Sequence, residues 1–104
     1  MRIKLFDESI EKFISSLNKP TIAKVLRIID LLEIFDYRLG LPHCKKVANN
    51  LFELRIRGKQ EIRIFYTFFK NEIVLLHSFI KKSQKIPQKE LQIASKRLKR
   101  LTNI

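Results

Sequence analysis

Residues 51–82, LFELRIRGKQEIRIFYTFFKNEIVLLHSFIKK, decide the fold of this chain. Three runs rich in β-branched and aromatic residues follow one another there, and such residues fit the pleated surface of a sheet. Short polar connections separate the runs. Lys70-Asn71 has the length of a two-residue hairpin turn, and asparagine tolerates the positive φ that such a turn needs. The stretch therefore predicts three consecutive β-strands, at 51–57, 62–69 and 72–80.

Alternation along the first run predicts a half-buried strand with a charged outer face. Successive side chains of a strand point to opposite sides of the sheet. Apolar and charged residues separate accordingly, with Phe52, Leu54 and Ile56 on one face and Glu53, Arg55 and Arg57 on the other. In the second run the same alternation places Arg63 and Tyr66 on opposite faces. The third run is the most apolar, so we expect it inside the sheet with both faces covered.

The flanking segments have the periodicity of helices. Apolar residues between Ile10 and Leu17 recur at i, i+3, i+4 and i+7, and a broader apolar arc runs from Pro20 to Phe35. We expect these two helices to form an αα-hairpin over one sheet face. A last helix beginning near Pro87 has an apolar stripe and a strongly basic opposite face, and its stripe consists of Leu91, Ala94, Leu98 and Leu101.

The remaining segments contribute little regular structure to this prediction. Residues 2–6 alternate weakly, which indicates a short N-terminal strand, and residues 37–50 are interpreted as a connecting loop because Gly40 and Pro42 interrupt any periodic pattern. The predicted fold is α+β, a small mostly antiparallel sheet of three to four strands with an N-terminal αα-hairpin and a basic C-terminal helix. We expect residues 1–104 to form one domain.

Composition narrows the class of protein. A single cysteine, Cys44, excludes an internal disulfide framework and fits a reducing compartment. The first residues lack the apolar core of a signal peptide, and no apolar run is long enough to span a bilayer. We therefore expect a soluble cytoplasmic protein with no membrane partner, and nothing in the sequence calls for a metal or another cofactor.

The positive charge is concentrated in one part of the chain. Residues 1–36 carry six basic and six acidic side chains, whereas residues 37–104 carry sixteen basic and four acidic ones, so the net charge of +12 comes entirely from the second part. Excess charge localised in this way predicts an anionic partner, either nucleic acid or an acidic protein. A merely solubilising surface does not need such one-sidedness.

Arginines on the predicted sheet are the best candidates for contact with phosphate. The guanidinium group stays charged and offers a rigid fork of donors that matches phosphate oxygens. Arg57 and Arg63 flank the same tight connection, so antiparallel pairing should bring them close together across the hairpin. The alternative is an exposed face whose charge Glu53 and Glu61 neutralise.

His77 and Tyr66 are further candidates for chemistry within the strands. Histidine can move a proton near neutral pH, and a tyrosine can donate a hydrogen bond or stack on a base. Equally, a strand histidine is often a packing residue, and a strand tyrosine is usually part of the core. We find no zinc-ligand spacing, Gly-rich phosphate loop or nucleophile motif.

Taken in order, LFELRIRG, RIFYTFF, EIVLLHSFIKKSQKIPQKEL and a basic AxKRLKRL helix closely resemble the RelE/ParE toxin superfamily, in particular its phage-derived HigB-like branch. The resemblance covers nearly the whole chain and is strongest from Pro42 to Leu101. It implies a toxin of a type II toxin–antitoxin system that cleaves messenger RNA in the ribosomal A site without a metal. It also implies an antitoxin that wraps or plugs the toxin.

The resemblance assigns roles to single residues. It implies catalytic roles for Arg55, for Arg63 and Tyr66 of an RxxY segment, and for His77 as the proton-transfer group. Where some relatives place a tyrosine after the last strand, this chain has only Ser83, Gln84 and Gln88. The residues expected to bind RNA are basic side chains of the strands, of the stretch after them and of the last helix: Arg57, Lys81, Lys82, Lys85, Lys96, Arg97, Lys99 and Arg100.

Two other functions stay open from the sequence. Another branch of the same superfamily poisons DNA gyrase without nuclease activity, and a basic module that binds RNA or an acidic partner without chemistry has the same composition. The charged strand face and His77 argue modestly against the gyrase alternative. The expected antitoxin offers acidic residues and an amphipathic segment, and by analogy it carries a helix-turn-helix DNA-binding domain.

Overall fold

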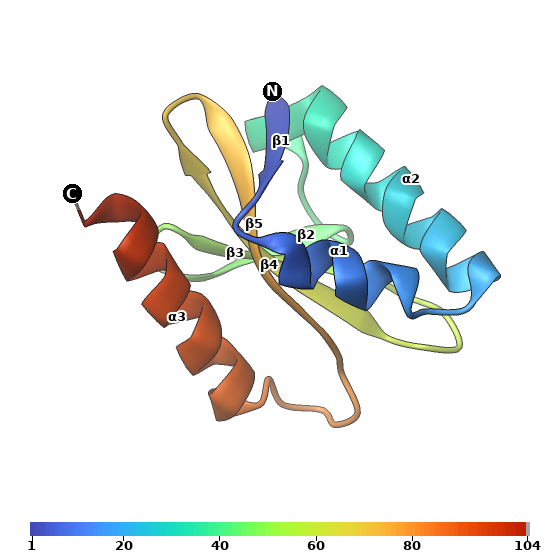
Figure 1. Ribbon diagram of the computed structural model, residues 1–104. Coiled ribbons are helices and arrows are strands. Elements are labelled where there is room, and N and C mark those ends of the chain that lie inside the picture. Colours follow the sequence, from blue (N-terminus) through green and yellow to red (C-terminus); the bar gives the residue numbers. More distant parts are fainter. Residues whose placement is uncertain (104) are drawn as a thin grey trace.

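The computed structural model describes residues 1–103 and shows a five-stranded sheet with helices on both faces (Figure 1). In chain order the elements are β1 (Arg2–Leu5), α1 (Glu8–Ser15), α2 (Lys19–Phe35), a 3-10 turn η1 (Asp36–Arg38), β2 (Cys44–Ala48), β3 (Leu51–Ile56), β4 (Ile62–Phe69), β5 (Glu72–Ile80) and α3 (Gln88–Thr102). The α+β prediction is confirmed, and so are the three consecutive strands of the central stretch. Among these elements no helix is long and apolar enough to cross a membrane.

The sheet has the strand order β1-β5-β4-β3-β2, in which β1 runs parallel to β5 and every other pair is antiparallel. The expected count of three to four strands is wrong, because part of the segment interpreted as a loop forms β2. Lys45 pairs with Glu53 and Lys46 with Phe52, across a turn in which Asn50 has a φ of 56°. Edge strands often carry exposed lysines, and in β2 two adjacent lysines interrupt the alternation of apolar and polar residues by which a strand is predicted.

One face of the sheet is covered by α1 and α2, as the αα-hairpin prediction required (Figure 1). Capping fixes where both helices begin, since the Asp7 side chain accepts a hydrogen bond from the Ser9 N–H and the Asn18 side chain accepts one from the Thr21 N–H. The core beneath them is mainly apolar, and its buried members include Ile10, Val25, Ile28, Leu32, Leu54, Ile64, Tyr66, Ile73 and Leu75.

The other face of the sheet is covered by α3, which forms a second, smaller core. The predicted stripe docks here, with Ala94 fully buried and Leu91, Leu98 and Leu101 partly buried, against Leu51, Phe65, Val74, Leu76 and Phe79. The charged face of β3 lies on this side of the sheet. It is therefore not the outer face that alternation suggested, and Glu53 is only 1% exposed and Arg63 only 2%.

A bulge between β4 and β5 sets which side chains of β5 face α3. Phe65 pairs with His77 and Tyr66 pairs with Leu75, so Leu76 is the extra residue. Leu75 consequently belongs to the core under α1 and α2, while Leu76 belongs to the core under α3. His77 follows on the α3 side, which is the side that carries the arginines.

Candidate functional site

A hollow of 390 Å³ opens where β3 ends, β4 begins and β5 leaves the sheet. We call it the cationic hollow. Five cations and one carboxylate line it, together with two polar residues of the following loop: Arg55, Arg57, Arg63, Lys81, Lys82, Glu61, Ser83 and Gln84. So many positive charges around one hollow make it a candidate site for an anion.

Strand register and a single backbone contact hold these groups together. Arg55 on β3 lies directly opposite Arg63 on β4. Arg57 and Arg63 meet at Glu61, whose Oε1 is 3.6 Å from Arg57 Nη1 and 3.7 Å from Arg63 Nη2. The backbone N–H of Lys81 donates to the Glu61 carbonyl over 2.7 Å, which fixes the start of the basic loop against the β3–β4 turn. The expected closeness of Arg57 and Arg63 is thus present, and the strand register adds Arg55 to them.

A buried carboxylate, that of Glu53, lies next to both strand arginines. Its Oε1 accepts a hydrogen bond from Arg55 Nε over 2.9 Å and lies 3.7 Å from Arg63 Nε. Within residues 1–103, neither Glu53 Oε2 nor Arg63 Nε has a hydrogen-bond partner. The sequence indicates Glu53 only as a neutralising surface charge, whereas the structure buries it against both arginines. An acid two residues before Arg55 is the signal in the sequence that points to this contact.

Burial is the main cause that lowers the pKa of Arg63 below its ordinary value, and Glu53 and Glu61 oppose that effect. A guanidinium remains charged at neutral pH even so, because its ordinary pKa is far above 7. Arg63 Nη1 donates to the Ile62 carbonyl over 3.0 Å. The group is therefore fixed in place, desolvated and positively charged, which strengthens its interaction with a bound anion.

His77 lies on the arginine side of the sheet but not in the lining of the cationic hollow. Its Nε2 is 3.0 Å from Oε1 of Glu90 on α3, and its ring stacks on Phe79 with centroids 6.1 Å apart. Both partners of the pair are largely covered, with side chains 15% and 19% exposed. Sequence reasoning did not foresee Glu90. The pair joins the first turn of α3 to the sheet.

Tyr66 is on the opposite face from the arginines. It is 1% exposed and packs against Phe52, with ring centroids 5.4 Å apart, in the core under α1 and α2. Burial raises the pKa of its phenol above the ordinary value, and the neighbouring Cys44 adds to the shift. The structure does not bring Tyr66 together with Arg55 and Arg63.

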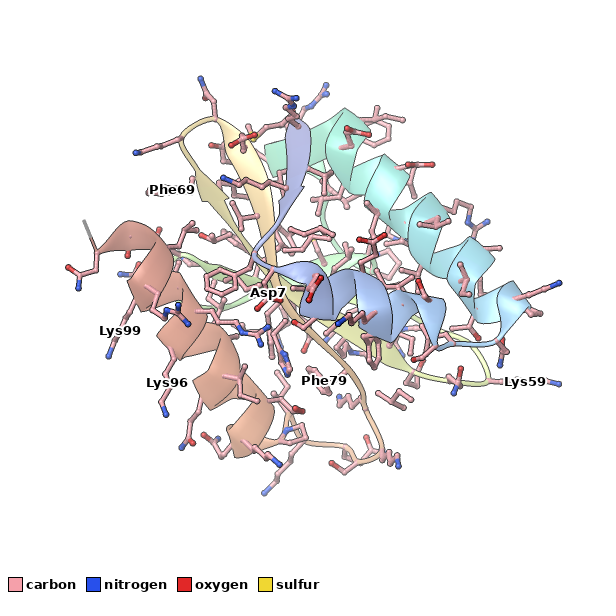
Figure 2. All side chains as sticks on the ribbon, in the orientation of Figure 1. Asp7, Lys59, Phe69, Phe79, Lys96 and Lys99 are labelled. Carbon is pink, nitrogen blue, oxygen red and sulfur yellow. The ribbon has the colours of Figure 1, made fainter. Side chains whose placement is uncertain are left out.

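The basic residues of α3 divide into two groups. Lys96, Lys99 and Arg100 are exposed, and Lys96 and Lys99 point away from the sheet (Figure 2). Arg97 corrects the expectation of an outward cation, because it is half-buried, donates to the Leu76 carbonyl over 2.7 Å and lies over the Phe6 ring. Lys85 is exposed in the loop before the helix.

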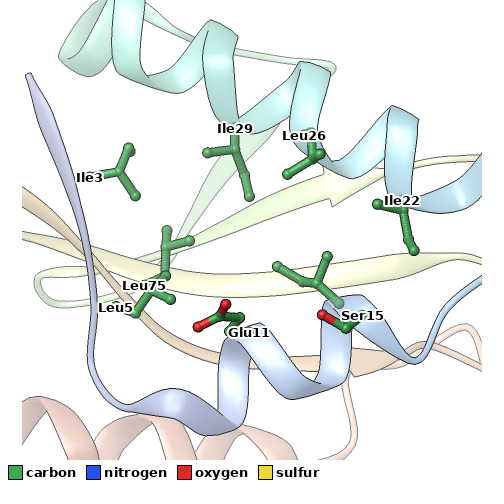
Figure 3. A pocket seen from close by; sticks show the side chains of 9 residues that line it. Ile3, Leu5, Glu11, Ser15, Ile22, Leu26, Ile29 and Leu75 are labelled. Carbon is green, nitrogen blue, oxygen red and sulfur yellow. The ribbon is translucent and has the colours of Figure 1, made fainter.

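A larger hollow, of 480 Å³, lies between α1 and α2 (Figure 3). Its walls are apolar except for Glu11 and Ser15, and the apolar side chains are Ile3, Leu5, Ile14, Ile22, Leu26, Ile29 and Leu75. One carboxylate and one hydroxyl offer no cluster of charges for an anion. Over residues 1–103, no group of three or more His, Cys, Asp or Glu side chains is placed to hold a metal ion.

Comparison with known proteins adds a family to this geometry. A family model described as phage-derived protein Gp49-like (DUF891) matches residues 12–99, which include every residue of the cationic hollow. A search of curated proteins finds no match.

Proposed function

This chain belongs to the Gp49-like family of phage-derived proteins (DUF891), which is related to the toxins of toxin–antitoxin systems, and we propose that it is such a toxin and cleaves messenger RNA in the ribosomal A site. The observation that supports the proposal most is the cationic hollow, in which Glu53 and Glu61 hold Arg55 and Arg63 in fixed positions. Its natural ligand is the phosphodiester of an RNA strand.

The proposed reaction uses the RNA's own 2′-hydroxyl as nucleophile. The 2′-oxygen attacks the adjacent phosphorus, the new O2′–P bond forms and the P–O5′ bond breaks. The 2′-proton is lost to solvent or a base, and the 5′-oxygen takes up a proton. Cleavage by this route leaves a cyclic phosphate and a 5′-hydroxyl. Its demands on the protein are alignment of the strand, stabilisation of negative charge on the phosphorane and help to the leaving oxygen.

The groups of the hollow match two of those demands directly. Arg55 and Arg63 are preorganised by Glu53, so they offer donors to the phosphorane without rearranging at the moment of reaction. Lys81 and Lys82 lie at the hollow's edge on the loop side, where their ammonium groups can hold the leaving oxygen. Our proposal uses neither Tyr66, which faces the other core, nor His77, whose Nε2 is engaged by Glu90.

We also propose that a cognate antitoxin neutralises the toxin in the cytoplasm. Such a partner should cover the cationic hollow with an acidic segment, because the chain's excess charge of +12 gives it electrostatic attraction to that partner as well as to RNA. Binding of RNA and of the antitoxin should then be mutually exclusive.

The experiment is induction of the protein in bacteria, followed by primer extension on a reporter message with an intact or an inactivated start codon. Cuts within codons of the translated message, and none in the untranslated one, are the expected result. Growth arrest without cuts would overturn the nuclease proposal in favour of a gyrase-directed toxin. No arrest and no cuts would favour a binding module without chemistry.

A further inference from the structure

A second, smaller hollow lies on the other side of Arg55 and Arg57, between α2 and β3. Its volume is 160 Å³. We call it the flanking hollow, and its lining combines basic and apolar side chains: Lys24, Arg27, Ile28, Pro42, His43, Arg55, Ile56 and Arg57. Because Arg55 and Arg57 line both hollows, the two sites adjoin one another.

The flanking hollow has four cations and no carboxylate in its lining. Lys24 and Arg27 are three residues apart on α2, so they lie on the same face of the helix, and both are exposed. Across residues 1–103, no carboxylate oxygen comes within 4.0 Å of either group. Arg55 and Arg57 are paired with Glu53 and Glu61, so Lys24 and Arg27 are the two cations of the hollow whose charge no such carboxylate offsets, and an anion bound there would offset it.

The Lys24 ammonium group lies close to Gly58, in the turn between β3 and β4. A Cβ at position 58 would lie 2.8 Å from Lys24 Nζ, so the glycine leaves room for the ammonium group against the β3–β4 turn. Lys24 thereby approaches the segment that joins Arg57 to Glu61 and Arg63. The cation of α2 and those of the sheet thus surround one space.

We propose that the flanking hollow binds a second backbone phosphate of the same RNA strand, next to the phosphate held in the cationic hollow. Lys24 and Arg27 contact this phosphate from α2, and Arg57 contacts it from the position directly after β3. The inference rests on the proposed function, since it assumes that the cationic hollow takes RNA. It adds α2, in which the sequence indicated only core residues, to the RNA-binding surface.

The size and the chemistry of the flanking hollow favour RNA over an acidic protein. A space of 160 Å³ admits a phosphate group but not a helix. Guanidinium groups match phosphate oxygens in pairs, and His43, half-buried in the lining, offers a flat ring on which a base can stack. A polynucleotide also has phosphates at regular spacing, as two adjoining cationic sites require.

The test is binding of a short single-stranded 2′-O-methyl RNA, which cannot be cleaved, measured by fluorescence anisotropy over a range of salt concentrations. The variant is Lys24→Ala with Arg27→Ala. The matched control is Arg2→Ala with Lys4→Ala, which removes one arginine and one lysine, also exposed, from β1 near the far edge of the sheet. Thermal melting of both variants checks that they remain folded.

Binding by the Lys24/Arg27 variant should be weaker, and the magnitude of its slope of log affinity against log salt should fall by about 0.7, since the variant loses one phosphate contact and each such contact on a single strand contributes about 0.7. The control should keep the wild-type slope. An unchanged slope in the Lys24/Arg27 variant, with binding still sensitive to Arg55→Ala, would overturn the inference alone. RNA binding that Arg55→Ala does not alter would instead overturn the proposed function.

A glutamate-rich peptide, tested in parallel, separates the two classes of partner. If the peptide binds with the same dependence on Lys24 and Arg27 and the RNA does not, the flanking hollow serves an acidic protein and the inference is wrong.

Discussion

The two faces of the sheet are built from alternate residues of the same strands, yet they have different chemistry. The face under α1 and α2 has an apolar core, and the polar side chains buried on it, Tyr66 and Ser78, are uncharged. The face under α3 buries Glu53 and Arg63 beside apolar residues. Burying ions costs free energy even when they are paired. The first face therefore stabilises the fold through apolar burial alone. The second face contributes less stability, because it also buries charges, and it holds those charges in fixed positions for a ligand.

The largest expected effect is the loss of activity in Arg55→Ala. Removal of one preorganised donor to a transition-state anion typically lowers the rate about 10²–10³-fold. Arg55→Ala also removes the hydrogen bond to the buried Glu53 carboxylate, so the variant should lose stability as well, and cleavage is compared per folded molecule. Cleavage of a translated message should be measured in both proteins, with circular dichroism as the check on folding. Wild-type cleavage by a folded Arg55→Ala protein would remove the arginine from the site.

The matching change on the other face is Leu54→Ala. Leu54 is fully buried and lies next to Arg55 in sequence but points to the opposite core. Its truncation should lower the free energy of unfolding by about 2–5 kcal/mol, because a cavity remains. Urea denaturation measures this loss. Cleavage per folded molecule should stay near wild type, and a large fall in it would show that the two faces are not separate in function.

A smaller effect is expected from Glu90→Gln. The change keeps the shape of the side chain and a hydrogen bond to His77 but removes the charge, so the free energy of unfolding should fall by about 1 kcal/mol or less. Cleavage should change less than threefold, because neither partner lines the cationic hollow. A fall as large as that of Arg55→Ala, in primer-extension assays of folded protein, would place the His77–Glu90 pair in the reaction.

The smallest effect at neutral pH is expected from Tyr66→Phe, which should leave cleavage unchanged. The difference appears in alkali. The pKa of Tyr66 is raised above its ordinary 10.0 in the folded protein, so above pH 10 the unfolded chain loses a proton that the folded chain keeps. Wild-type stability should therefore fall more steeply than that of the variant, by about 0.7 kcal/mol per pH unit at pH 10 and by close to 1.4 at pH 11. Equal slopes in denaturation at pH 9.5–11 would contradict this.

Much of the fold was predictable because its signals are local. Alternation located β3, β4 and β5, and the stripe from Leu91 to Leu101 identified the docking face of α3. The burial of the charged strand face was not predictable from alternation, which separates polar from apolar side chains but does not say what covers either. The strand β2 was not predicted because it is an edge strand with two adjacent lysines, so its sequence does not alternate between apolar and polar residues.

The candidate site was predictable only in part. Antiparallel register brought Arg55 and Arg63 together, as neighbouring strands require. The helix that closes over His77 supplies Glu90 from 13 residues away, and no spacing rule connects the two. The place of Lys24 and Arg27 beside Arg55 and Arg57 was not predictable. The apolar arc of α2 identifies the residues that this helix buries, but it does not say which side chains of the sheet lie next to its polar residues.

The most direct test of the central proposal uses purified ribosomes, the protein and a message with a single 2′-deoxynucleotide at the mapped cut. Attack by the 2′-hydroxyl requires that group, so cleavage should occur in the all-ribose message, leave a cyclic phosphate and vanish at the deoxy position. Undiminished cleavage of the deoxy message would contradict the mechanism derived from the cationic hollow. Absence of cleavage in both messages would contradict the proposed function itself.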